Sequence, residues 1–263
     1  MTILQSIILG AVEGITEFLP ISSTGHLILA SEMLKLAKSA FLSSFEIGIQ
    51  LGAILAVVVL YAKRVWRNRV LFKTVGVAFL PAAFIGLFFY KIIKMYLFNN
   101  SAVVLWSLLV GGIILIIFEY FHKEKMEPKN FDAPADRAEN ITVKQALAIG
   151  FFQCFAMIPG VSRSAATIIG GLSLGLTRRA IVEFSFLLAI PTMLAATGLD
   201  LLNTGGSFSG HEWGLLASGF ISAFIVAWFS VGWLLDFIKK HSFTVFGVYR
   251  IVIALLFFAL ILR

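Results

Sequence analysis

The sequence predicts an all-α polytopic membrane protein with six transmembrane helices and two re-entrant helical hairpins in an inverted-topology repeat. Composition is the first observation behind this class: 59% of the 263 residues are hydrophobic, 13% are charged, and the mean hydropathy is +0.96. A soluble domain of this length would be far less apolar. The second observation is that strict alternation of apolar and polar residues is missing, which argues against closed strands.

Six apolar runs account for the predicted transmembrane helices. Each is roughly 20 residues long, enough for a helix to cross about 30 Å of hydrocarbon. The runs cover residues 44–62, 74–98, 101–121, 180–202, 213–236 and 243–262.

Two polar segments interrupted by glycine and proline remain outside these runs, at 1–38 and 143–175. Each is too interrupted for a clean crossing, so we expect a re-entrant hairpin. Non-helical backbone at membrane depth is tolerated only when it is buried in protein or lines a wet cavity. The expected helical arms are 3–18 and 25–37 around Pro20, and 143–157 and 164–175 around Pro159 and Gly160.

The hairpins open two related halves, approximately 1–121 and 143–263, of a single membrane domain over 1–263. A charged loop, 122–142, joins them. Each half would hold one hairpin and three crossings, and an odd number of crossings turns the second copy upside down. The hairpin tips would then meet near the midplane. Shifts of 140 or 141 residues place Gln5 on Gln145, Gly10 on Gly150, Glu13 on Gln153, Ser22 on Ser162 and Ser101 on Ser242, with Glu46 near Glu183.

Basic residues predict the orientation of the chain. When the crossings are traced, 14 of the 21 lysines and arginines fall on one face and five on the other, while Arg163 and Arg250 stay within the protein. By the positive-inside rule the first face is cytoplasmic, so we expect both termini and the mouth of the first hairpin outside. The net charge of +7 then reflects topology, and we expect no nucleic acid partner.

Two minor features suggest no chemistry. Cys154 is the single cysteine and lies in an apolar segment, which predicts a buried, inert thiol. The first residues carry no basic segment before their apolar positions and no small-residue cleavage site, so we expect no cleaved signal peptide.

The first hairpin contains two glutamates four residues apart, Glu13 and Glu17. On a helix they share one face, where neighbouring carboxylates repel and require a cation or a shared proton. A divalent metal ion would satisfy that requirement. The alternative is ordinary helix polarity at the membrane surface, but ionisable groups within membrane segments are expensive and usually functional.

The stretch "PISSTGH" follows these glutamates. Its hydroxyls, on Ser22, Ser23 and Thr24, can cap the helix that begins near Gly25. Capping needs only one hydroxyl and leaves His26 unexplained. A histidine can carry a proton near neutral pH, so the segment combines a hydroxyl nucleophile with a proton carrier beside an acid pair.

The stretch "PGVSRSAAT", residues 159–167, predicts a phosphate site in the second hairpin. Helix-terminal N–H groups favour anions, and a guanidinium binds phosphate oxygens in a bidentate manner. The alternative is an arginine that snorkels to lipid headgroups. The candidate phosphate ligands are Arg163, Ser162, Ser164 and Thr167.

Four further polar residues are weaker candidates for the cavity wall. Glu46, Gln50 and Glu183 lie on the crossings that follow the hairpins, where an interhelical hydrogen bond is an equally good interpretation. Arg250 follows Tyr249 and could neutralise a buried carboxylate.

Together these motifs resemble those of the undecaprenyl-diphosphate phosphatase family, the bacitracin-resistance type of bacterial inner-membrane enzyme. "EGITEFLPISSTGH" resembles the acidic and Ser-Ser-Thr-Gly-His motifs of that family, and "PGVSRSAAT" its Pro-Gly-x-Ser-Arg-Ser-x-x-Thr motif. "FEIGIQLGAILAV" and "EFSFLLAIP" are further similar blocks. The resemblance implies hydrolysis of undecaprenyl diphosphate to the monophosphate carrier for cell-wall synthesis. It also implies a divalent cation, Mg²⁺ or Ca²⁺, and an active site open to the outer leaflet.

The resemblance also implies residue roles. Glu13 and Glu17 would bind the metal and serve acid–base chemistry, Ser23 would be the nucleophile, His26 would move protons, and Arg163 would hold the diphosphate. Ser22 and Thr24 would support Ser23 and help to bind the substrate phosphate.

The substrate's prenyl tail would stay in the bilayer while its diphosphate enters the hairpin cavity. Oligomeric state is left open, with a homodimer as one arrangement. The alternative function is a transporter or lipid flippase, because many secondary transporters are also built from inverted repeats with broken helices.

Overall fold

The protein is described by a computed structural model over residues 1–96, 101–122, 137–204 and 208–261. Within these ranges it is all-helical and has no strand, as the composition predicted. The first half of the chain contains α1 (Ile3–Thr16), α2 (Ser23–Met33), α3 (Ala40–Arg67), α4 (Arg69–Tyr96) and α5 (Ser101–Phe121). The second contains α6 (Val143–Cys154), α7 (Arg163–Ser173), α8 (Arg178–Thr204), α9 (Gly210–Phe237) and α10 (Thr244–Ile261), with short 3₁₀ turns η2 (Ala138–Asn140) and η3 (Phe155–Met157).

Among the helices of the described ranges, five are long and apolar enough to cross a membrane, namely α3, α4, α5, α8 and α9. The chain is therefore a polytopic helical membrane protein. The sixth predicted crossing, 243–262, corresponds to α10, whose apolar part Thr244–Ala259 is shorter than the five others. Most of the predicted connector 122–142 lies outside the described residues.

The expected hairpin arms are found as α1 with α2 and as α6 with α7, and each pair begins with the same capping box. Thr2 caps the backbone of Gln5, and the Gln5 side chain accepts a hydrogen bond from Thr2 N. Thr142 and Gln145 make the same pair of contacts. Such a reciprocal cap satisfies two backbone donors that a helix start leaves unpaired.

Each arm pair is closed in a similar way. Gln5 Nε2 donates to Leu34 O at 3.2 Å, and Gln145 Nε2 donates to Leu174 O at 3.5 Å. Between the arms, Ser22 and Ser162 have φ values of 70° and 76°. A non-glycine residue in this left-handed region is strained and persists only where its surroundings fix it.

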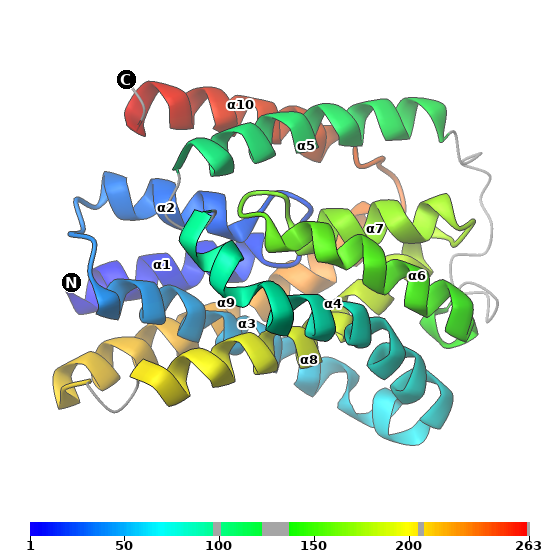
Figure 1. The fold of residues 1–263 in the computed structure, drawn as a ribbon, viewed down its shortest axis with the longest axis horizontal. Helices are drawn as coiled ribbons and strands as arrows, with labels where there is room; N and C mark the ends of the chain where they lie inside the picture. Colours follow the sequence, from blue (N-terminus) through cyan, green and yellow to red (C-terminus); the bar gives the residue numbers. More distant parts are fainter. Residues whose placement is uncertain (97–100, 123–136, 205–207, 262–263) are drawn as a thin grey trace.

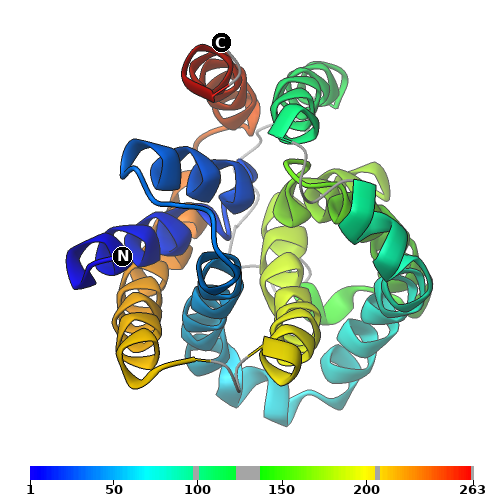
Figure 2. The same cartoon turned by 60° about the vertical axis from the view of Figure 1, so that its left-hand side comes forward.

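The two arm pairs lie against long helices of the opposite half. Helix α1 packs along α9, α6 packs along α4, and α3 crosses α8 between them. Figure 1 and Figure 2 show α5 and α10 side by side as a separate layer, with α2 and α7 between that layer and the remaining helices. The two turns of the hairpins thus meet inside the helical body.

Glycines allow the arms to pack closely on their partners. A Cβ at Gly10 would overlap the carbonyl oxygen of Gly219 on α9, and one at Gly150 would overlap that of Ala78 on α4. Small residues at helix contacts let backbones approach in this way. Cys154, predicted to be buried, is half-buried, and its thiol donates to Gly150 O at 3.2 Å.

We expect Gly10→Ala to lower stability by about 1–3 kcal/mol, because the added methyl must push α1 away from α9. Gly76→Ala is the matched control, since a Cβ there meets nothing within 4 Å. Thermal unfolding of both purified variants in detergent measures the difference. Equal midpoints for the two variants would contradict the close approach.

Candidate functional site

A cavity of about 120 Å³ lies where the two hairpin turns meet. Its wall draws on both halves of the chain, which places the two sequence motifs around one space. The lining residues are Glu17, Ser22, Ser23, Thr24, Gln50, Ala156, Met157, Pro159, Gly160, Ser162, Arg163 and Met193.

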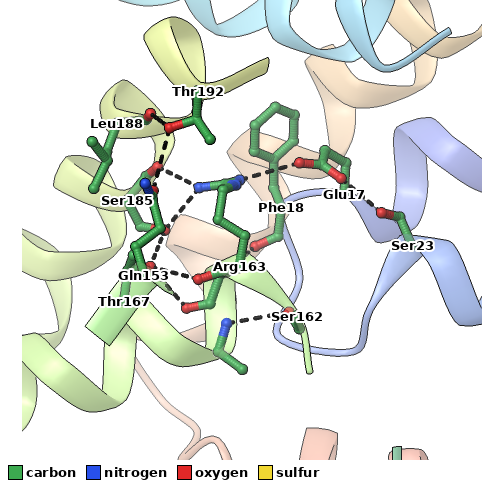
Figure 3. Close-up of polar contacts among 12 residues, drawn as sticks. Glu17, Phe18, Ser23, Gln153, Ser162, Arg163, Thr167, Ser185, Leu188 and Thr192 are labelled. Carbon is green, nitrogen blue, oxygen red and sulfur yellow. Dashed lines mark hydrogen bonds and ion pairs between the residues drawn. The ribbon is translucent and has the colours of Figure 1, made fainter. Parts of the chain in front are cut away.

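A chain of hydrogen bonds connects the hairpins across this cavity. Ser23 Oγ donates to Glu17 Oε2 at 2.7 Å, and Arg163 Nη2 lies 3.3 Å from Glu17 Oε1 (Figure 3). All three side chains are buried. A hydroxyl in contact with a carboxylate base is the arrangement that activates a serine nucleophile.

Arg163 is held from its other side by α8. Its Nη1 donates to Ser185 O at 2.7 Å and to Ser185 Oγ at 3.3 Å, and the Ser185 hydroxyl lies 2.7 Å from Thr167 Oγ1 (Figure 3). Arg163 Nε is buried and makes no hydrogen bond within the described residues. One donor of the guanidinium is therefore unpaired within the described residues.

Ser185 was not predicted from the sequence. The signal was present, because it is a hydroxyl within the apolar block "EFSFLLAIP". A lone serine on a membrane helix usually bonds to its own backbone, so the residue type alone does not indicate a role in the site. Only the fold shows that it faces Arg163.

The other hydroxyls of the second motif make hydrogen bonds within the protein. Ser164 Oγ donates to Phe18 O at 2.7 Å and so joins α7 to the end of the first arm. Ser162 Oγ accepts from Ala165 N at 3.2 Å and caps α7. The prediction that they bind phosphate stays a prediction for Ser162, which lines the cavity, whereas Ser164 and Thr167 do not line it.

His26 is buried next to the turn but does not line the cavity. Its Nδ1 lies 2.8 Å from Ser22 O, and its Nε2 lies 2.9 Å from the hydroxyl of Tyr249 on α10. Both ring nitrogens are thus occupied by groups other than Ser23 and Glu17.

Glu13 is fully buried, and neither of its carboxylate oxygens makes a hydrogen bond within the described residues. The carboxylates of Glu17 and Glu46 lie near it. Glu46 itself accepts a hydrogen bond from Ser31 Oγ at 2.9 Å and does not line the cavity. An unpaired buried carboxylate beside a second one is a pair that a cation would stabilise.

No group of three or more His, Cys, Asp or Glu side chains in the described part of the chain could hold a metal ion. The two glutamates still fit Mg²⁺, which commonly uses one or two carboxylates and completes its oxygen ligands with water and substrate phosphates.

Glu183 does not line the cavity, contrary to the sequence prediction. It forms ion pairs with Arg64 at 2.9 Å and Arg179 at 3.1 Å, and Arg64 also pairs with Glu139 of η2. The Arg64 guanidinium holds the pKa of Glu139 below its ordinary value. Glu183 therefore joins α8 to α3, which was the alternative interpretation of its position. Gln50 does line the cavity.

Arg250 also differs from its prediction, because it is bonded to backbone carbonyls rather than to a carboxylate. It is fully buried and donates to carbonyls of α5 and of both hairpin turns. The acceptors are Ser107 O at 2.8 Å, Leu108 O at 3.3 Å, Pro20 O at 3.4 Å, Gly160 O at 2.9 Å and Val161 O at 2.8 Å.

The family model described as bacitracin resistance protein BacA matches residues 6–256, nearly the whole chain. The chain belongs to the BacA family. Among its relatives, the undecaprenyl-diphosphatase of Aquifex aeolicus (strain VF5) is 51% identical over 262 residues, with 100% of both chains covered.

Two other relatives carry the same name. The undecaprenyl-diphosphatase of Sulfurihydrogenibium sp. (strain YO3AOP1) is 47% identical, covering 98% of this chain and 99% of that protein. The undecaprenyl-diphosphatase of Wolinella succinogenes is also 47% identical, covering 98% of this chain and 97% of that protein. In this BacA-family chain, the motif residues Glu17, Ser23 and Arg163 meet in the cavity.

Proposed function

We propose that this chain is a membrane-embedded undecaprenyl-diphosphatase that hydrolyses undecaprenyl diphosphate to undecaprenyl phosphate and inorganic phosphate. The observation that carries the proposal is the contact of Ser23, Glu17 and Arg163 in a cavity between the hairpins. BacA-family membership and the names of the relatives agree with it. Recycling of the lipid carrier would support cell-wall synthesis and bacitracin resistance.

In this proposal Arg163 binds oxygens of the terminal phosphate, using the donor that is unpaired in the structure. Ser23 Oγ attacks the terminal phosphorus while Glu17 accepts the hydroxyl proton. The bond from phosphorus to the bridging oxygen breaks, and undecaprenyl phosphate leaves. Water then hydrolyses the phosphoserine, which releases phosphate and restores Ser23.

A divalent cation, Mg²⁺ or Ca²⁺, is the proposed cofactor, with Glu13 and Glu17 as its protein ligands. It would supply positive charge to the phosphoryl oxygens, where charge spreads during transfer. The support is that Glu13 is buried beside Glu17 with both oxygens unpaired.

We further propose the full topology of an inverted repeat with six crossings and two re-entrant hairpins. The matched capping boxes, the two strained serines and the reciprocal packing of α1 on α9 and α6 on α4 support it. The site would open to the outer face of the bacterial inner membrane, with both termini outside, as the distribution of basic residues predicts. The prenyl tail would remain among lipids, and a homodimer stays an open arrangement.

The transporter or flippase alternative is not favoured. A carrier of a neutral solute needs no serine against a carboxylate, and the relatives are named as diphosphatases.

Replacing Arg163 with lysine should lower kcat/KM more than tenfold. A single ammonium cannot keep the contacts to Glu17 and Ser185 and also bind phosphate, so about 2–5 kcal/mol of transition-state stabilisation is lost. Arg179→Lys is the control, because it makes the same change outside the cavity. Phosphate release from undecaprenyl diphosphate in detergent measures both, and near-full activity of Arg163→Lys would remove it from the site.

Ser23→Ala should lower kcat by about 100-fold or more if Ser23 is the nucleophile. Loss of a helix cap alone costs roughly 0.5–2 kcal/mol of stability and spares turnover. Ser173→Ala, which removes an exposed hydroxyl from α7, serves as the control. A Ser23→Ala protein that inserts normally and stays within a few-fold of the parent rate would refute this role.

Metal dependence tests the two glutamates against their repeat counterpart. Glu13→Gln and Glu17→Gln should lose most activity or require far more Mg²⁺ or Ca²⁺, because a hard anionic ligand is lost. Gln153→Ala should lose at most a hydrogen bond to Thr192, worth about 1 kcal/mol. Phosphate release is measured against metal concentration for all three. Comparable losses at Gln153 would contradict a single site in the first hairpin.

A further inference from the structure

Tyr249 on α10 contacts His26 of the first hairpin. The Tyr249 hydroxyl lies 2.9 Å from His26 Nε2, and the two rings are parallel within 2° with centroids 5.5 Å apart. Tyr249 is 39% exposed and does not line the cavity, so it cannot touch a phosphate bound there. Its contact with His26 connects it to the turn that carries Ser23.

The partners of His26 define the direction of these hydrogen bonds. Ser22 O can only accept, so His26 Nδ1 carries the hydrogen. The imidazole is 8% exposed, and burial disfavours a charged ring. In the neutral ring Nε2 is an acceptor, and the Tyr249 hydroxyl donates to it.

His26 is hydrogen-bonded to the carbonyl of Ser22, whose backbone is strained. Ser22 has a φ of 70°, is the residue before Ser23, and makes no capping hydrogen bond with its own side chain. In the second hairpin the equivalent Ser162 does cap its helix, and Ala166 stands at the position equivalent to His26. In the first hairpin a histidine side chain therefore bonds to the backbone of the turn, whereas in the second the serine side chain caps the helix.

Arg250, the residue after Tyr249, reaches the same turn directly. It donates to Pro20 O and, in the other turn, to Gly160 O and Val161 O. Two consecutive residues of α10 therefore fix the backbone on either side of Ile21 in the first turn. Tyr249 bonds to His26, which bonds to Ser22 O, and Arg250 donates to Pro20 O.

We propose that Tyr249 is a positioning residue, which orients the His26 imidazole so that Nδ1–H stays on Ser22 O and Ser23 Oγ stays on Glu17. The inference rests on the proposed phosphatase function. In this proposal His26 fixes the backbone of the turn through Ser22 O. The proton of the Ser23 hydroxyl passes to Glu17.

The kinetic test compares Tyr249→Phe with Tyr120→Phe, which removes the same hydroxyl from an exposed position on α5. Tyr249→Phe should lower kcat by about tenfold with KM within about twofold, because a displaced Ser23 affects the reaction more than binding. His26→Asn should recover at least about tenfold of the rate lost in His26→Ala, since the Asn amide can donate to Ser22 O as Nδ1–H does. In the His26→Asn background, Tyr249→Phe should change kcat by less than about twofold.

A second measurement determines the tautomer of His26 in the absence of substrate. ¹⁵N NMR of the histidine-labelled chain, with His26 assigned by its absence from His26→Asn, should show the Nδ1–H tautomer in the wild type. In Tyr249→Phe the same signal should report a mixture of tautomers, because Nε2 has lost its donor.

Three results would overturn the proposal: wild-type kcat in Tyr249→Phe, an equal loss in the His26→Asn background, or an Nε2–H tautomer in the wild type. A wild-type chain that releases no phosphate would instead refute the proposed function itself. The two failures are therefore distinguishable.

Discussion

The buried ion pair between Glu17 and Arg163 is the interaction on which the site depends. Both side chains lie in an apolar chain, where an unpaired charge is costly, and each comes from a different hairpin. The pair therefore requires the two turns to meet. Ser23 on one side and Ser185 on the other provide the remaining hydrogen bonds. A bound phosphate could take over part of the arginine's contacts at little further desolvation cost, because the charges are already out of water.

The two halves share a backbone arrangement but differ in the side chains that they place around the cavity. Capping boxes, strained serines and close helix contacts recur about 140 residues apart, so both turns reach the same space. The side chains around that space differ. Met157 lines the cavity at the position equivalent to Glu17, and Gln153 replaces the buried Glu13. The first hairpin thus supplies the acids and the hydroxyl, and the second supplies the arginine.

Features encoded by local pattern were predictable from the sequence. The lengths of the apolar runs predicted the long helices, and the breaks at Pro20 and Pro159 predicted the turns between the paired arms. The meeting of the two motifs followed from the repeat. Contacts between distant helices were not predictable. Glu183 is a cavity candidate from the sequence because its crossing follows a hairpin, but on α8 it pairs with Arg64 instead. The partners of Arg250 could not be predicted from the sequence, because they are backbone carbonyls and every residue has one.

A double-mutant cycle on kcat/KM, with Glu17→Gln and Arg163→Lys alone and together, tests most directly whether the hairpins form one site. Residues that act as a unit give strongly non-additive losses. The account predicts that the double variant is at most about threefold slower than the slower single variant. If the two losses multiply instead, Glu17 and Arg163 act independently, and a single phosphate site shared by the two hairpins is contradicted.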